Sequence, residues 1–262
     1  MSEDLLIDVT DGIGTITLNR PDKLNAFTED MLFGVVAALD EFEDRDDVSV
    51  VILAGAGRAF CSGGDVSRMG DAADRRPHVT KRHIWRTIQA VPKRLARFEK
   101  PVLCAVQGPA VGGGMDLALA CDIRVAATSA RFCESYCRIG LLPGGGGGYF
   151  LPRIIGRARS LEMFWTAAFV NAEQALEIGL VSHVYPDEDL MSETRKLAAK
   201  IVAMPPYSVR QVKRLIDQSL VSDMTTAFDL VSSHIAVARA SKDHVEAIAA
   251  FREKRPGNFT GQ

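Results

Sequence analysis

The sequence lacks any segment that would direct the chain across or into a membrane. Its N-terminal residues 1–19 carry acidic side chains where a signal peptide needs cations, and they contain no long apolar core. No stretch approaches the roughly 20 consecutive apolar residues that a membrane-spanning helix requires. We therefore expect a cytoplasmic protein that does not associate with membranes.

Cysteine and net charge are also scarce. Five cysteines, an odd number scattered between Cys61 and Cys137, do not form the pattern of a disulfide framework. The formal net charge is −2, from 31 basic and 33 acidic residues, which gives the chain no general attraction to nucleic acid or to anionic lipid. We expect no nucleic-acid partner, and any anionic ligand must be held by a local arrangement of donors.

Several signatures of nucleotide, metal or serine chemistry are missing. The chain has no phosphate-binding G-x-x-x-x-G-K-[ST] loop, and the glycines at 112–114 lack the spacing of a dinucleotide fingerprint. It has no G-x-S-x-G nucleophile elbow. Cys133 and Cys137 have no histidines at ligand spacing, so we expect no metal site.

What the sequence does contain is an alternation of strand and helix patterns. Its 262 residues are 47% hydrophobic and 24% charged, an ordinary globular composition. Alternating apolar residues around the Asp11-Gly12 turn predict a hairpin, and Thr28 is placed to cap a helix. Strands are predicted at 5–9, 13–18, 48–54, 102–106 and 123–127, with helix at 115–120 and a helical excursion within 66–100 that becomes regular from His83.

The composition becomes helical towards the C-terminus. Pro205-Pro206 interrupts the chain, because proline removes a backbone donor and disfavours helix at the preceding residue. Val209, Val212 and Ile216 then form an apolar stripe, and Ser241 can cap a further helix. We predict a core at 1–200 and a helical region at 201–262, whose amphipathic helices pack either on their own core or on another subunit.

Two glycine-rich turns each follow a predicted buried strand. The first spans residues 59–65 and the second spans residues 108–114. Consecutive glycines allow positive φ and leave their backbone N–H groups unshielded by side chains. Such groups can bind an anion or a developing oxyanion. Either turn alone is equally typical of an ordinary loop after a strand.

These turns, with motifs spread along most of the chain, resemble the crotonase (enoyl-CoA hydratase/isomerase) superfamily. The matching segments are Leu18-Asn19-Arg20-Pro21, Leu24-Asn25-Ala26, residues 59–65, Gly112-Gly113-Gly114, Cys121-Asp122, residues 139–143, Leu151-Pro152-Arg153, and residues 175–181 and 251–255. The resemblance implies an α/β fold, a crotonase-type spiral of strand–strand–helix units with a C-terminal helical trimerisation region. It also implies a homotrimer or hexamer and an acyl-CoA thioester substrate, with coenzyme A as part of the substrate and no tightly bound cofactor.

The resemblance further implies where the thioester is held. By position, Gly64 and Gly113 would supply the backbone N–H groups of an oxyanion hole. A thioester carbonyl held by two donors is a better electron sink, and losing one donor typically costs about 2.7–4 kcal/mol of transition-state stabilisation. Contacts to the substrate and its coenzyme A are implied for Lys23, Leu24, Ser62, Asp65 and Val66 and, contributed by a neighbouring subunit, for Phe251 and Lys254.

The acid–base positions differ from those of typical hydratases of the family. Those enzymes carry a glutamate two residues after the triple glycine and another about twenty residues further on, where this chain has Asp116 and Tyr136. Asp116 keeps a carboxylate among apolar neighbours, which favours catalysis over helix-dipole compensation worth about 0.3–1 kcal/mol. A phenol with a reference pKa of about 10 is a poor base at neutral pH, although it can donate a proton or a hydrogen bond.

Glu134 is a second candidate carboxylate. If residues 132–136 are extended, Phe132, Glu134 and Tyr136 point to one face, and Glu134 enters the same cavity as Tyr136. Hydration of a double bond needs one group to activate water and another to protonate carbon, and two carboxyl groups suit both tasks. Alternatively Glu134 is structural, bonded to a backbone N–H or paired with Arg131 or Arg138.

The run of five glycines at 144–148 is open to two interpretations. It leaves room for a bulky acyl group, or it is merely a flexible turn. Some isomerases of the resembled family carry a catalytic aspartate at the position of Gly144.

Three functions are compatible with these residues. The first is a lyase or isomerase that hydrates or isomerises an enoyl-CoA by stabilising the enolate of its thioester. The second is a hydrolase that cleaves a carbon–carbon bond in a β-dicarbonyl compound, and the third is a non-catalytic acyl-CoA binding protein.

Overall fold

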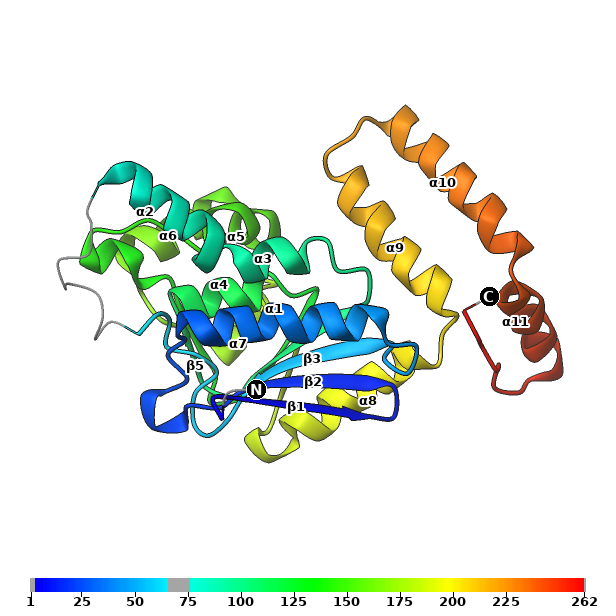
Figure 1. The fold of residues 1–262 in the computed structure, drawn as a ribbon, viewed down its shortest axis with the longest axis horizontal. Coiled ribbons are helices and arrows are strands. Elements are labelled where there is room, and N and C mark those ends of the chain that lie inside the picture. The colour runs from blue at the N-terminus through cyan, green and yellow to red at the C-terminus, as the bar shows by residue number, and fades with distance from the viewer. Residues whose placement is uncertain (1–2, 66–75, 262) are drawn as a thin grey trace.

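A computed structural model describes residues 3–65 and 76–261 of the chain (Figure 1). Within these ranges the strands form a six-stranded sheet in the order β1-β2-β3-β4-β6-β9 and a three-stranded sheet in the order β5-β7-β8. The strands are β1 (Leu5–Thr10), β2 (Ile13–Leu18), β3 (Val50–Gly55), β4 (Val102–Val106), β5 (Pro109–Val111), β6 (Ile123–Ala127), β7 (Arg131–Cys133), β8 (Val170–Asn171) and β9 (His183–Tyr185).

Helices connect the strands and make up the rest of the chain. The α-helices are α1 (Glu29–Asp44), α2 (Pro77–His83), α3 (Ala90–Leu95), α4 (Gly113–Leu119), α5 (Gly147–Ile155), α6 (Arg157–Thr166), α7 (Ala172–Glu177), α8 (Leu190–Val202), α9 (Pro206–Ser219), α10 (Met224–Ala240) and α11 (Lys242–Glu253). Shorter helical turns are η1 (Pro21–Lys23), η3 (Ile84–Ile88), η4 (Ser135–Ile139) and η5 (Asp187–Asp189).

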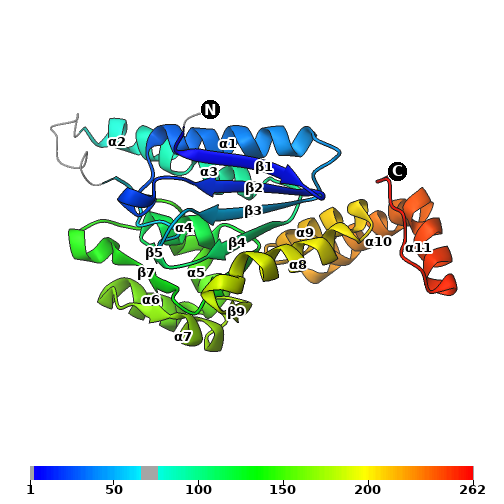
Figure 2. The ribbon, with the colours of Figure 1, turned by 90° about the horizontal axis from the view of Figure 1, so that it is seen from below.

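Helices lie on both faces of the larger sheet, as Figure 2 shows. Side chains alternate across a strand, so Val51 and Leu53 of β3 join the core beneath α1, whereas Val50 and Ile52 join a second core with α8. The predicted hairpin β1–β2 is antiparallel, and the remaining pairs of this sheet are parallel. Covering by helices on both faces explains why β3 and β4 are almost continuously apolar.

The predicted caps and central strands agree with the structure. Strands β2, β4 and β6 have the predicted bounds. The Thr28 hydroxyl accepts a hydrogen bond from the Met31 N–H at the start of α1, and the Ser241 hydroxyl accepts one from His244 at the start of α11. These local predictions hold because a cap depends only on neighbours within one helical turn.

Two local predictions are wrong. Helix begins at Pro77 rather than becoming regular only from His83, and residues 66–75 of the predicted excursion lie outside the described ranges. The segment 132–136 is not extended throughout, because β7 ends at Cys133 and a 3-10 turn follows at Ser135–Ile139. The pairing partner β5 ends at Val111, so no strand continues alongside the chain beyond Cys133.

The C-terminal helices α9, α10 and α11 project away from the spiral as an arm (Figures 1 and 2). Large apolar side chains on the arm are exposed, among them Val212, Ile216, Leu220, Phe228, Ile235, Val245 and Phe251. The alternative that these helices pack on their own core is therefore wrong for most of their length. No helix in the described part of the chain has the length and apolar content needed to cross a membrane.

Candidate active site

The two glycine-rich turns lie against each other. Cys61 pairs with Ala110 in an isolated bridge, and the Cys61 carbonyl accepts a hydrogen bond of 2.9 Å from the Val111 N–H. A β-carbon placed on Gly113 would lie 3.7 Å from the Gly64 nitrogen. The backbone N–H groups of Gly64 and Gly113, far apart in sequence, are therefore neighbours in space.

This close approach requires glycine. A β-carbon on Gly114 would lie 2.1 Å from the Cys61 carbonyl oxygen, and one on Gly113 would lie 2.7 Å from the Phe27 ring. Neither the Gly64 N–H nor the Gly113 N–H donates to an acceptor in the described part of the chain. Two adjacent donors without acceptors are the arrangement that an oxyanion hole needs.

Asp116 lies in α4, directly after this turn, and is only 1% exposed. Its Oδ2 atom accepts hydrogen bonds from the Tyr136 hydroxyl at 2.5 Å and from the Gly145 N–H at 2.8 Å. Its Oδ1 atom is buried and has no hydrogen-bond partner among the described residues. The carboxyl group is thus held through one oxygen, and the other oxygen is available for chemistry.

Glu134 is completely buried, and neither of its carboxyl oxygens has a hydrogen-bond partner within the described ranges. The expected alternative of a bond to a backbone N–H or a pairing with Arg131 or Arg138 is wrong, since neither carboxyl oxygen has such a partner and Arg138 donates instead to the Ala167 carbonyl at 2.6 Å. A buried carboxyl group without partners is costly, which is typical of functional rather than structural positions.

Gly147, the first residue of α5, lies between the two carboxyl groups. A β-carbon there would approach Asp116 Oδ1 to 2.3 Å and Glu134 Oε1 to 2.7 Å. The two unpartnered oxygens therefore face the same small space. In the five-glycine run, Gly145 closely contacts Asp116, and Gly147 closely contacts both carboxyl groups. Neither interpretation of the run from the sequence predicted these contacts.

Burial gives the two carboxyl groups different protonation states. Desolvation raises the pKa of Asp116 to about 6, although the hydrogen bonds from Tyr136 and Gly145 and the nearby Gly147 backbone oppose this shift. Desolvation and then the nearby Asp116 charge raise the pKa of Glu134 to about 10. At neutral pH Asp116 is mainly a carboxylate and Glu134 is a neutral acid, so the pair holds a base and an acid together.

Because the pKa of Glu134 rises from 4.5 to about 10 on folding, the folded state binds its proton more tightly than the unfolded state. The free energy of unfolding should then fall as pH rises between these values. We expect the melting temperature of the wild type to fall between about pH 5 and pH 9, and that of Glu134→Gln to fall less. Calorimetry at steps of pH tests this, and parallel curves for the two proteins would contradict it.

The residues predicted to contact coenzyme A lie in two places, at the first glycine turn and at the end of α11. Lys23, Leu24 and Ser62 lie together beside the first glycine turn, since the Ser62 N–H donates to the Leu24 carbonyl at 3.0 Å. The Asp65 carboxylate is bonded to Arg20 at 3.2 Å, a partner that the sequence did not suggest. Val66 lies outside the described residues.

Phe251 and Lys254 lie at the end of α11, at the far end of the arm (Figure 1). Phe251 is 84% exposed. A single chain does not bring these two residues to Lys23 or Ser62. Their predicted contact with the cofactor portion of a substrate therefore requires a second chain.

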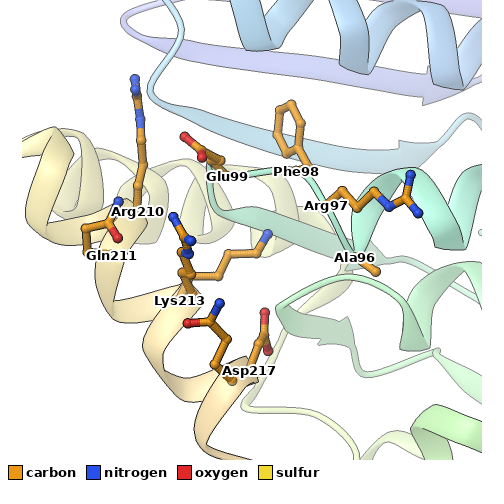
Figure 3. A pocket seen from close by; sticks show the side chains of 10 residues that line it. Ala96, Arg97, Phe98, Glu99, Arg210, Gln211, Lys213 and Asp217 are labelled. Atoms are coloured by element: carbon orange, nitrogen blue, oxygen red, sulfur yellow. The ribbon is translucent and has the colours of Figure 1, made fainter. Parts of the chain in front are cut away.

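A cavity of about 290 Å³ lies elsewhere, between residues 96–99 and helix α9 (Figure 3). Phe98 and Glu99 line one side, and Arg210, Lys213 and Asp217 line the other. None of its lining residues belongs to the glycine turns or to the carboxyl pair. The cavity lies where the arm meets the core. No group of three or more His, Cys, Asp or Glu side chains placed to hold a metal ion occurs within residues 3–65 and 76–261.

Known proteins share both the sequence and the fold. The sequence model of the family described as enoyl-CoA hydratase/isomerase matches residues 8–262. The 1,2-epoxyphenylacetyl-CoA isomerase of Escherichia coli (strain K12) is 36% identical, with 100% of both chains covered. The crotonyl-CoA hydratase of Syntrophomonas wolfei is 31% identical over 98% of each chain. A crystal structure of an enoyl-CoA hydratase from Bacillus anthracis has a TM-score of 0.94 at 30% identity, covering 99% of this chain and 100% of that one.

The described core, with its two sheets and adjoining glycine turns, has the crotonase fold that the sequence motifs predicted. The chain belongs to the enoyl-CoA hydratase/isomerase family and is an enzyme of that family.

Proposed function

We propose that this enzyme binds an enoyl-CoA thioester, stabilises its enolate and moves a proton between Asp116 and Glu134. The observation that carries the proposal is the pair of buried carboxyl groups on either side of Gly147, whose facing oxygens Asp116 Oδ1 and Glu134 Oε1 have no hydrogen-bond partner among the described residues. Acyl-CoA substrates are also named for the related isomerase and hydratase.

In the proposed chemistry Asp116 Oδ1 removes a proton from the carbon chain. The electron pair of the broken C–H bond moves through the conjugated system to the thioester oxygen. The Gly64 and Gly113 N–H groups hold the resulting negative charge. When the enolate collapses, Glu134 donates its proton to carbon, and the proton on Asp116 returns to Glu134. The net result is a shifted double bond with no gain or loss of atoms.

Hydration uses the same two groups in a different way. Asp116 then takes its proton from a water molecule, whose oxygen forms a bond to the β-carbon while Glu134 protonates the α-carbon. Tyr136, which stands where typical hydratases carry a second glutamate, cannot take over as base because burial and the Asp116 charge raise its pKa far above neutral. We propose that Glu134 supplies the second carboxyl group instead.

The test is to incubate the enzyme with a panel of enoyl-CoA and acyl-CoA thioesters in deuterated water and to follow products by mass spectrometry. Addition of water makes the enzyme a hydratase. Deuterium at the α-carbon or γ-carbon without addition of water makes it an isomerase. The absence of both signals over the whole panel contradicts the proposal, and turnover of free β-diketones or thioester binding alone would support the other two candidate functions.

We further propose that the core at 1–200 and the helical region at 201–262 have separate roles, with the arm joining chains into trimers or dimers of trimers. Support comes from the exposed apolar side chains along α9–α11 and from Phe251 and Lys254, which lie far from the other predicted coenzyme A contacts.

Cutting the chain after Pro205 should abolish the assembly, because it removes the whole apolar arm. We expect sedimentation of the intact enzyme to give three or six times the chain mass, and the shortened chain to be monomeric or aggregated. A shortened chain that keeps the mass ratio and melting temperature of the intact assembly would contradict the proposed role of the arm.

A further inference from the structure

We propose that Tyr136 is a positioning residue that selects which oxygen of Asp116 reacts, by donating its hydroxyl proton to Oδ2 and leaving Oδ1 as the base. The inference rests on the proposed function, in that Asp116 must be the base. It assigns to the phenol neither proton donation to substrate nor contact with the reacting carbon.

The geometry around Oδ2 supports this role. Tyr136 and the Gly145 N–H both donate to Oδ2, at 2.5 and 2.8 Å, from two different segments of the chain. Two donors converging on one atom fix the rotation of the carboxyl group about its side-chain bond. The other atom, Oδ1, is then held towards Gly147 and Glu134. A hydroxyl proton already committed to a carboxylate is poorly placed to protonate a substrate.

Tyr136 also connects the base to the oxyanion turn. A β-carbon on Gly112 would lie 4.0 Å from the Tyr136 ring and 3.1 Å from the Ser135 hydroxyl. The Gly112 N–H donates to the Cys133 carbonyl at 2.8 Å. The ring is thus placed between the turn that presents the Gly113 N–H and the carboxylate that removes the proton, so one side chain maintains the distance between the two halves of the site.

Among the described residues, the Tyr136 phenol is the principal side-chain donor to Asp116, because the ionisable groups nearby are neutral or are bonded to other partners. Glu134 faces it across Gly147 and is neutral at pH 7. Helix α3 also packs on α4, but its Lys93 donates to a backbone carbonyl and its Arg94 pairs with two carboxylates of α1. The Tyr136 hydrogen bond therefore favours the ionised form of Asp116 and lowers its pKa.

The experiment compares the pH profiles of kcat and of α-proton exchange for Tyr136→Phe, the control Tyr149→Phe and the wild type. Tyr149 is a half-exposed phenol on α5 that stacks on Arg153, so removal of its hydroxyl should leave the profile unchanged. For Tyr136→Phe we expect kcat at neutral pH to fall about 10- to 100-fold, the range for loss of a hydrogen bond to a charged group. KM should change less than about threefold, because the phenol does not touch substrate.

The acid limb of the profile distinguishes positioning from proton donation. Loss of the hydrogen bond raises the pKa of the base, so the limb should move to higher pH and part of the lost rate should return on the alkaline side. An equal loss at every pH, with an unmoved limb, would overturn the inference and make Tyr136 a proton donor. If Asp116→Asn retains exchange, the proposed function itself fails. If Asp116→Asn abolishes exchange but Tyr136→Phe leaves the acid limb in place, only the role of Tyr136 fails.

Discussion

Replacing Asp116 by asparagine is expected to lower turnover about 10²–10⁴-fold, the usual contribution of a positioned general base. The two donors at Oδ2, from Tyr136 and Gly145, require an oxygen acceptor at that position. The asparagine carbonyl will therefore take the place of Oδ2, and its NH₂ group will take the place of Oδ1. The variant is expected to keep the shape and the hydrogen bonds of the site but to carry a donor in place of the proposed base.

Affinity for a saturated acyl-CoA should change little, because neither of the proposed oxyanion donors, the Gly64 and Gly113 N–H groups, is altered. The matched control is Asp30→Asn, since Asp30 is also an acidic residue in the first turn of a helix, but it is exposed. If Asp116 served only to compensate the helix dipole, both variants would lose about 0.3–1 kcal/mol of stability and keep their activity. Steady-state kinetics and calorimetry on both proteins decide between these readings, and wild-type turnover by Asp116→Asn removes Asp116 from the mechanism.

Replacing Gly147 by alanine is expected to lower kcat by about 10²-fold or more, because a misplacement of about 1 Å in a catalytic group has effects of this size. The added methyl group would lie 2.3 Å from Asp116 Oδ1 and 2.7 Å from Glu134 Oε1, so the carboxyl groups must move apart. The backbone of Gly147 does not have a positive φ, so alanine is allowed there apart from these two contacts and a tight one of 3.3 Å to the Phe164 ring.

Gly148 provides the matched control in the same turn of α5. A β-carbon at Gly148 meets only the Pro143 ring, at an ordinary 3.4 Å. Both substitutions replace glycine by a better helix former, worth roughly 0.5–1 kcal/mol in a helix interior, so the stability effect of helix propensity is shared. We expect Gly148→Ala to keep near wild-type turnover. Equal activity of the two variants would show that the space between the carboxyl groups plays no part in the reaction.

Much of the architecture could be predicted from sequence because it rests on short-range patterns. The alternation in β1, the apolar runs of β3 and β4, and the caps at Thr28 and Ser241 each depend on residues a few positions apart. The two glycine turns were also recognisable as donors of free N–H groups. The order of the family motifs was sufficient to predict the crotonase fold, which the related structures confirm.

The surroundings of the carboxyl groups could not be predicted from such short-range patterns. An extended segment would have placed Glu134 and Tyr136 side by side, whereas the chain turns after Cys133 and sends the phenol to Asp116 Oδ2. The turn begins where β7 loses its pairing with β5, whose last residue, Val111, lies more than twenty positions earlier in the chain. The position of Gly147 between two carboxyl groups likewise could not be predicted from the run of five glycines, because it depends on the tertiary structure.

The family, the alternation of strands and helices, and the two glycine turns could thus be predicted from the amino-acid sequence, because these features depend on local periodicity and on the spacing of motifs. The tertiary structure was needed to show that burial raises the pKa of Glu134 well above that of Asp116, and that helix α11, which carries Phe251, lies on the arm away from the glycine turns. The physical reason is that desolvation and the Coulomb interaction depend on which groups surround a side chain in space, and those groups come from elements distant in the chain.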